Sequence, residues 1–159
     1  MRITVTAIGR LKAGPERLLF QRYFDRAAKA GRGLGLTFAV REFPESRAAR
    51  PAARMSDEAA AILKALPSDA TLVALDETGT NLDSHGFAGR LAKWRQAGVA
   101  DLAFAIGGAD GQGAAVAERA DLRLALGSLT WPHQLVRVML AEQLYRAVTI
   151  LTGHPYHRD

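Results

Sequence analysis

Apolar residues gather in five short runs rich in Val, Ile, Leu and Phe, over residues 3–8, 36–43, 71–75, 102–106 and 122–126. Their length and composition predict β-strands. Between these runs the apolar positions recur at helical spacing, which predicts helices over residues 16–29, 56–66, 87–97, 114–119 and 133–151. Strands that alternate with helices favour one α/β domain over residues 1–159, with a mostly parallel sheet covered by helices on both faces.

Residue types that are common at helix ends and in turns support these boundaries. Pro15 stands before the first predicted helix, Ser56 is placed to cap the second, and Pro67 is expected to end it. Residues 76–79 are expected to turn the chain at the end of the third strand.

The last predicted helix is apolar on nearly every side. A domain of this size cannot bury all of that surface against one sheet, so a symmetric partner subunit is expected to cover the rest, in a homodimer. Glu142 and Arg146 are spaced i, i+4, which we interpret as a pair that stabilises the helix rather than as catalytic residues.

Composition excludes several classes of protein. With 159 residues, 48% hydrophobic and 23% charged, the chain belongs with globular proteins, and it has no apolar run long enough to cross a membrane. The strand-like start lacks the features of a signal peptide, so the expected location is the cytoplasm. The absence of cysteine excludes disulfides and thiolate chemistry, and four histidines without clustered carboxylates predict no metal site.

Charge is distributed unevenly along the chain. Residues 1–55 hold 12 Lys and Arg against 4 Asp and Glu, whereas residues 56–159 hold 9 against 12. A basic region of this kind suits a polyanion such as RNA, although a solvated basic surface explains the charge equally well. The candidate contacts are Arg10, Lys12, Arg17, Arg22, Arg26, Arg47, Arg50 and Arg54.

Two glycine-containing loops follow the fourth and fifth strands, at residues 107–111 and 126–131. Ligands of open α/β sheets bind at the carboxyl ends of strands, so these loops and residues 76–79 are expected to form one pocket. The glycine spacing matches neither the dinucleotide fingerprint nor the Walker A loop. His133 follows at the start of the last helix, where we expect a hydrogen-bonding role rather than catalysis.

Several motifs together resemble the ribosomal large subunit methyltransferase H family, of the SPOUT class of methyltransferases. They are the segments 106–111, 128–134 with Arg137, 142–147 and 156–158. The resemblance implies a C-terminal trefoil knot, a homodimer and S-adenosylmethionine as methyl donor. It also implies methylation of ring nitrogen 3 of pseudouridine 1915, in the helix 69 loop of 23S rRNA in the assembled ribosome.

The same resemblance implies the site residues. Departures from the usual family pattern at Gly127, Leu129 and Trp131 keep the lining small or apolar. The tail is expected to fold over the cofactor pocket, where Tyr156 or His157 would assist deprotonation of the base and Arg158 would hold a phosphate or a developing oxyanion. The expected cofactor contacts are Leu75, Gly107, Leu126, Gly127, Ser128, Leu129, Thr130 and Trp131.

Three alternatives stay open at this point. The glycine-rich pocket suits a nucleotide-binding enzyme of another reaction type, and the basic region suits an RNA-binding protein without catalysis. A SPOUT methyltransferase that acts on a different RNA nucleotide is the third.

Overall fold

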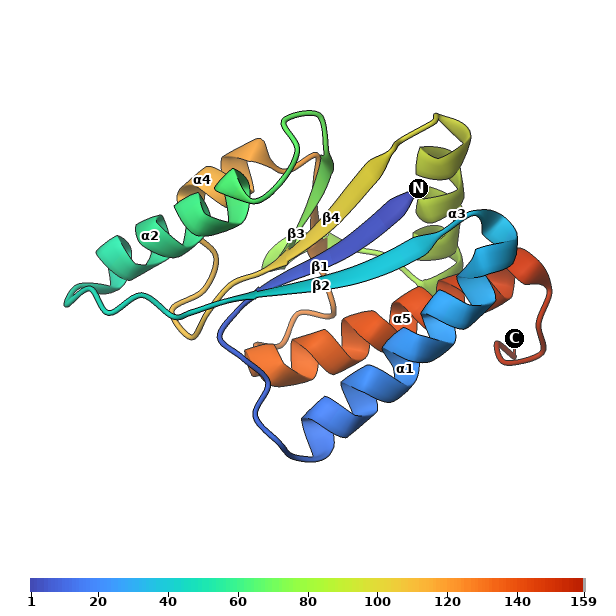
Figure 1. The fold of residues 1–159 in the computed structure, drawn as a ribbon, viewed down its shortest axis with the longest axis horizontal. Helices are drawn as coiled ribbons and strands as arrows, with labels where there is room; N and C mark the ends of the chain where they lie inside the picture. Colours follow the sequence, from blue (N-terminus) through green and yellow to red (C-terminus); the bar gives the residue numbers. More distant parts are fainter. Residues whose placement is uncertain (159) are drawn as a thin grey trace.

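A computed structural model describes residues 1–158 and contains one five-stranded sheet (Figure 1). The strands are β1 (Arg2–Ile8), β2 (Thr37–Phe43), β3 (Thr71–Asn81), β4 (Asp101–Ile106) and β5 (Leu122–Ala125), in the order β2-β1-β4-β3-β5. Every pairing between neighbouring strands is parallel, which confirms the predicted α/β class.

Helices cover both faces of the sheet, as the alternating pattern predicts (Figure 1). One layer contains α1 (Pro15–Gly31), α3 (Ser84–Gln96) and α5 (His133–Thr152), and the other contains α2 (Pro51–Lys64) and α4 (Ala114–Arg119). A short 3₁₀ helix (Arg32–Leu34) follows α1. Along β4 the larger Leu102, Phe104 and Ile106 pack under the first layer, whereas Ala103 and Ala105 lie under the second. Because side chains alternate between the two faces of a strand, the large side chains fill the core under the first layer and the small ones fill the core under the second.

Two helices begin earlier than their sequences suggest. The second begins at Pro51 and not at Ser56, because proline is preorganised for the first helical position. The third begins at Ser84 because the Asp83 carboxylate accepts a hydrogen bond from the Gly86 N–H at 2.6 Å.

Residues 76–79 do not end the third strand, contrary to the predicted turn. β3 pairs with β5 at Leu75, bulges outward, and pairs with Leu124 again at Thr80. Arg123 of β5 stabilises the bulge by donating to Asp76 Oδ2 at 2.7 Å and to Thr78 Oγ1 at 2.5 Å. Partial burial alone would raise the pKa of Asp76, but hydrogen bonds from Thr78 and Arg123 lower it below its usual value.

The chain itself covers most of α5, with α1 along one side and α3 along another. Leu140, Leu144 and Val148 are buried by these contacts, so much of the apolar surface that suggested a partner is covered within one chain. What stays exposed is a patch on α1 and the start of α5, where Leu18 is 73% and Leu135 39% exposed. Within the described residues no helix is long and apolar enough to span a bilayer.

Candidate functional site

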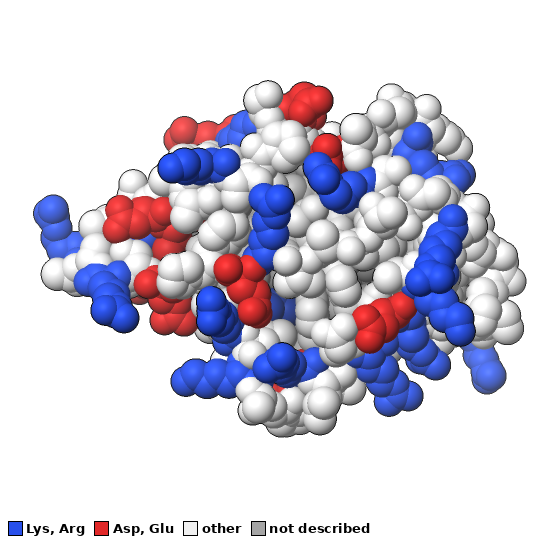
Figure 2. Space-filling model, in the orientation of Figure 1, with Lys and Arg blue, Asp and Glu red and all other residues white. Residues whose placement is uncertain are grey.

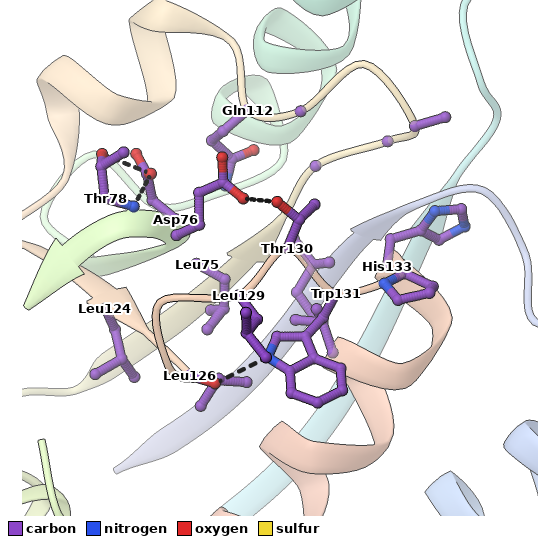
Figure 3. Close-up of a pocket in the computed structure, with 18 of the residues that line it drawn as sticks. Leu75, Asp76, Thr78, Gln112, Leu124, Leu126, Leu129, Thr130, Trp131 and His133 are labelled. Carbon is purple, nitrogen blue, oxygen red and sulfur yellow. Dashed lines mark hydrogen bonds between the residues drawn. The ribbon is translucent and has the colours of Figure 1, made fainter. Parts of the chain in front are cut away.

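A hollow of about 770 Å³ lies at the carboxyl ends of β3, β4 and β5 (Figure 3). It is bounded by the β3 bulge, the glycine turn after β4, the loop after β5 and the start of α5. This volume is typical of small-molecule sites, and the position is where parallel sheets bind ligands. The three loops expected to converge therefore do so, with a bulge in place of the third strand end.

Most of the residues predicted to contact a cofactor line this hollow. Ser128 is the exception among them: within the described part of the chain it is not a lining residue. The predicted residues that do line it are Leu75, Gly107, Leu126, Gly127, Leu129, Thr130 and Trp131. Glu77 also lines the hollow; it belongs to residues 76–79, which were expected to border the pocket, but it was not named as a cofactor contact. Val136 lines the hollow too, and it belongs to no glycine-rich turn and to none of the motifs named above.

The turn after β4 is too tight for any side chain at Gly107. A Cβ atom there would lie 2.4 Å from the Gly111 carbonyl oxygen and 2.9 Å from the Gln112 nitrogen. Gln112 closes the turn further by donating its side-chain N–H to the Ala105 carbonyl at 2.8 Å. Backbone therefore forms this wall of the hollow, which lets a ligand approach peptide groups directly.

Replacement of Gly107 by Ala should weaken cofactor binding at least about tenfold, because the turn must open to relieve contacts with backbone atoms that have no room to move. Calorimetry with S-adenosylmethionine measures the loss. Gly89→Ala on α3 is the matched control, since a Cβ there meets nothing within 4 Å. Equal affinities of the two variants would contradict a role for the tight turn.

The loop after β5 is closed by Trp131 of the loop itself (Figure 3) and by Asn81 at the end of β3. Trp131 Nε1 donates to the Leu126 carbonyl at 3.1 Å, and the Gly127 N–H donates to Asn81 Oδ1 at 3.0 Å. Gly127 adopts a positive φ of 102°, a conformation that glycine adopts without strain. The resulting wall is apolar with exposed peptide groups, which fits an adenine ring and a thioether chain.

Ion pairs hold two edges of the hollow. Arg123 pairs with Asp76, and Arg54 makes a bidentate pair with Asp110 at 2.6 and 3.0 Å. Hydrogen bonding from Arg54 lowers the pKa of Asp110. Arg54 is a candidate RNA contact, and in the structure its guanidinium holds the glycine turn, whereas the other seven candidates are exposed.

His133 is the first residue of α5 and lines the hollow, in keeping with the interpretation of a helix-start residue. Burial lowers the pKa of its imidazole, and the positive charge of Arg137 lowers it further. The ring is therefore neutral at physiological pH and one of its nitrogens accepts hydrogen bonds.

The C-terminal tail docks against α5 and α3, away from the hollow. Tyr156 donates its hydroxyl to Glu142 Oε1 at 3.0 Å, and Arg146 donates to the same oxygen. His157 Nδ1 lies 3.1 Å from Arg146 Nη1, and its Nε2 lies 3.1 Å from His85 Nε2. The pair Glu142–Arg146, interpreted from sequence as a helix-stabilising pair, thus also anchors the tail.

None of residues 156–158 lines the hollow within the described part of the chain. The tail therefore does not fold over the pocket of its own chain, in contrast to the expectation from sequence. The sequence pattern of the last helix does not predict where the tail lies. The direction of the tail after Gly153 is set by contacts with α5 and α3. The catalytic roles assigned to Tyr156, His157 and Arg158 stay predictions.

Comparisons with known proteins agree over the whole chain. The family described as predicted SPOUT methyltransferases matches residues 1–157. Proteins named ribosomal RNA large subunit methyltransferase H are 58% identical in Sinorhizobium medicae and 57% identical in Bradyrhizobium diazoefficiens, each over 99% of both chains. The protein of that name from Brucella anthropi is 57% identical over 100% of both chains.

A solved structure, that of a probable methylase family protein from Haemophilus influenzae Rd KW20, aligns with 99% of this chain and 70% of its own, at 14% identity and a TM-score of 0.47. The sequence matches span nearly every residue that builds the hollow and the tail. The chain therefore belongs to the SPOUT methyltransferases, in the ribosomal RNA large subunit methyltransferase H family.

Proposed function

We propose that this protein transfers a methyl group from S-adenosylmethionine to ring nitrogen 3 of a pseudouridine in helix 69 of 23S rRNA, acting on the assembled ribosome in the cytoplasm. The names of the full-length relatives support methylation of ribosomal RNA. The observation that carries the proposal is the hollow, because it gathers the cofactor residues expected of this family at one edge of the sheet.

The methyl donor supplies an activated methyl group on its sulfonium, so no residue has to act as a nucleophile. The protein has to hold the donor in line with the acceptor nitrogen and exclude water. Leu126, Leu129 and Trp131 provide the apolar wall for this task, and the backbone of the glycine turn at Gly107 provides the polar contacts. The C-terminal knot expected of the family stays a prediction.

The acceptor nitrogen carries a proton at neutral pH, and its removal requires a base or a group that stabilises the anion. In the docked tail, burial and the hydrogen bond to Glu142 raise the pKa of Tyr156, so this phenol holds its proton. A guanidinium only donates, so His157 Nδ1 accepts from Arg146 and that lone pair is in use. Neither side chain is available as a base in this position.

The tail therefore serves the reaction in another arrangement, and a homodimer supplies one. A second hollow, of about 650 Å³, separates the cofactor loop at Leu126 and Gly127 from the tail anchor at Glu142. Glu142 is nine residues beyond His133, roughly 13 Å along the helix. Antiparallel packing of two α5 helices about a two-fold axis would place the tail of one protomer at the cofactor pocket of its partner.

Exposed apolar side chains support the same interface. They occur on α1, on the loop after β5 and at the start of α5, which all border the second hollow or the first. Their exposure leaves a surface that a second copy would bury. The exposed residues are Leu18, Leu19, Leu129, Trp131 and Leu135.

Basic side chains follow β1 and β2, the two strands on the other side of β4 from β3 and β5. Arg10 and Lys12 follow β1, and Arg47 and Arg50 follow β2, so both pairs lie at the carboxyl edge of the sheet that also holds the hollow. Figure 2 shows Lys and Arg side chains at the tip beside α2 and along α1. Contacts from these residues to phosphates would hold the RNA hairpin beside the pocket.

Mass spectrometry of helix 69 tests the proposal. Ribosomes incubated with the protein and S-adenosylmethionine should gain one methyl group on the pseudouridine, because the acceptor nitrogen belongs to that base. Ribosomes that carry uridine at the same position are the control and should gain none. A methyl group on another nucleotide, or equal methylation of the control, would overturn the assignment of the base.

A further inference from the structure

Three carboxylates line the cofactor hollow, and they differ in their partners. Asp76 is paired with Arg123, and Asp110 with Arg54. Glu77, on the β3 bulge, accepts a hydrogen bond from the Thr130 hydroxyl at 2.5 Å. Among residues 1–158 no Lys, Arg or His side chain forms an ion pair with it. Glu77 therefore brings a negative charge to the hollow that the protein itself does not neutralise.

The position of Glu77 directs this charge across the hollow. The bulge at residues 76–79 lies opposite the loop 126–131, and the hydrogen bond to Thr130 joins the two walls (Figure 3). Oε2 takes the hydroxyl, which leaves lone pairs on both carboxylate oxygens for a ligand. Glu77 is exposed in the hollow, whose lining also includes the apolar Leu75, Leu124 and Leu126, and its charge would act more strongly on a ligand that excludes water from this wall.

The reaction proposed above changes the charge of the ligand in this hollow. S-adenosylmethionine carries a sulfonium, an ammonium and a carboxylate, and is a net cation. Transfer of the methyl group moves the sulfur–methyl bonding pair onto sulfur, and the acceptor nitrogen loses its proton to solvent. S-adenosylhomocysteine, the product, is a neutral thioether with no net charge. A carboxylate that faces the sulfur stabilises the sulfonium of the first ligand and not the thioether of the second, whereas the ammonium and the carboxylate are the same in both.

We infer that Glu77 is a specificity-determining residue that makes the pocket prefer the cationic methyl donor over the neutral product, and so favours product release and reloading. The inference rests on the proposed function for its cofactor, but not on which RNA base is methylated. Asp76 and Asp110 contribute less to this preference because Arg123 and Arg54 already neutralise them.

Calorimetry on the purified protein with three ligands tests the inference. The ligands are S-adenosylmethionine, S-adenosylhomocysteine and sinefungin, an unreactive analogue that carries an amine in place of the methylsulfonium. In Glu77→Gln, which keeps the shape and a hydrogen-bond acceptor, the two cationic ligands should bind about threefold to tenfold more weakly. The affinity for S-adenosylhomocysteine should change less than about twofold, because this ligand has no charge at the sulfur.

Two variants separate charge from structure. Thr130→Val keeps the carboxylate but removes its hydrogen bond, so any loss of affinity should be equal for all three ligands. Glu118→Gln removes the same charge from an exposed site on α4, outside the hollow, and should leave every affinity unchanged.

Three results would overturn the inference. Equal weakening of all three ligands in Glu77→Gln would mean that Glu77 holds the loop or pairs with the ammonium that the three ligands share, and unchanged affinities would mean that its charge plays no part. If the wild-type protein bound none of the ligands, S-adenosylmethionine would not be its cofactor, and the inference would fail as well. Failure to methylate helix 69 would leave these affinities untouched, so the two failures are distinguishable.

Discussion

A chain that ends at Pro155 is expected to bind S-adenosylmethionine as the full chain does and to methylate ribosomes about a thousandfold more slowly. The truncation removes Tyr156, His157 and Arg158, together with residue 159, which lies outside the described residues. Since none of residues 156–158 lines the hollow of its own chain, cofactor affinity should persist. Single-turnover methylation of ribosomes and calorimetry measure the two quantities separately.

Mixed dimers show where the tail acts. One protomer ends at Pro155 and keeps its pocket, and the other carries Gly107→Ala and keeps its tail. If the tail completes the partner's pocket, the mixed dimer regains activity at one site at a cofactor concentration that leaves the Gly107→Ala pocket empty, although each parent dimer is impaired at both sites. An inactive mixed dimer would mean that the tail acts on the pocket of its own chain. Full activity of the truncated chain would mean that the tail has no role in the reaction.

Arg137→Met is expected to reduce the free energy of unfolding by about 3 kcal/mol, because it leaves buried acceptors without a donor. The Arg137 side chain is 2% exposed, and its Nη1 donates to Glu42 Oε1 at 2.9 Å. Nη2 donates to the carbonyl oxygens of Ile8 and Gly9, at the end of β1. Glu42 in turn accepts from the Leu11 N–H at 2.9 Å, so one side chain joins α5 to two strands and the loop after β1.

Denaturant unfolding measures this loss, with Arg2→Met as the matched control. Arg2 pairs with Asp101 at 2.6 Å, but its side chain is 54% exposed, so its removal should cost less than about 1 kcal/mol. Burial lowers the pKa of Arg137, and Glu42 partly offsets this. Similar unfolding free energies for the two variants would show that the buried arginine is not a structural link.

Much of the architecture follows from short-range patterns. The five strands, the five helices and the parallel sheet were all predicted, because side-chain periods of two and of 3.6 residues are local properties. Helix starts at Pro51 and Ser84 were missed because capping at these positions depends on particular contacts, such as Asp83 with Gly86. The β3 bulge was missed for a related reason, since Arg123 stabilises it from another strand.

The candidate site was likewise predicted only in part. The glycine turn and the loop after β5 were predicted to meet, because the carboxyl ends of parallel strands share one edge of a sheet. Glu77 carries no pattern of its own in the sequence. Its importance depends on Thr130 and on the arginines that neutralise Asp76 and Asp110, and all of these partners lie far away along the chain.

Residue patterns in the chain were sufficient for the α/β class, for the loops that border the hollow and for the resemblance to the family, because periodicity and motif spacing are properties of residues close together in the sequence. Only the folded chain decided that Arg54 and Arg137 hold the structure together, that Glu77 is the one of the three carboxylates of the hollow without an ion pair within residues 1–158, and that the tail docks on α5. Charge pairing and burial are properties of neighbours in space. Residues far apart in the sequence become neighbours only when the sheet and its helices assemble.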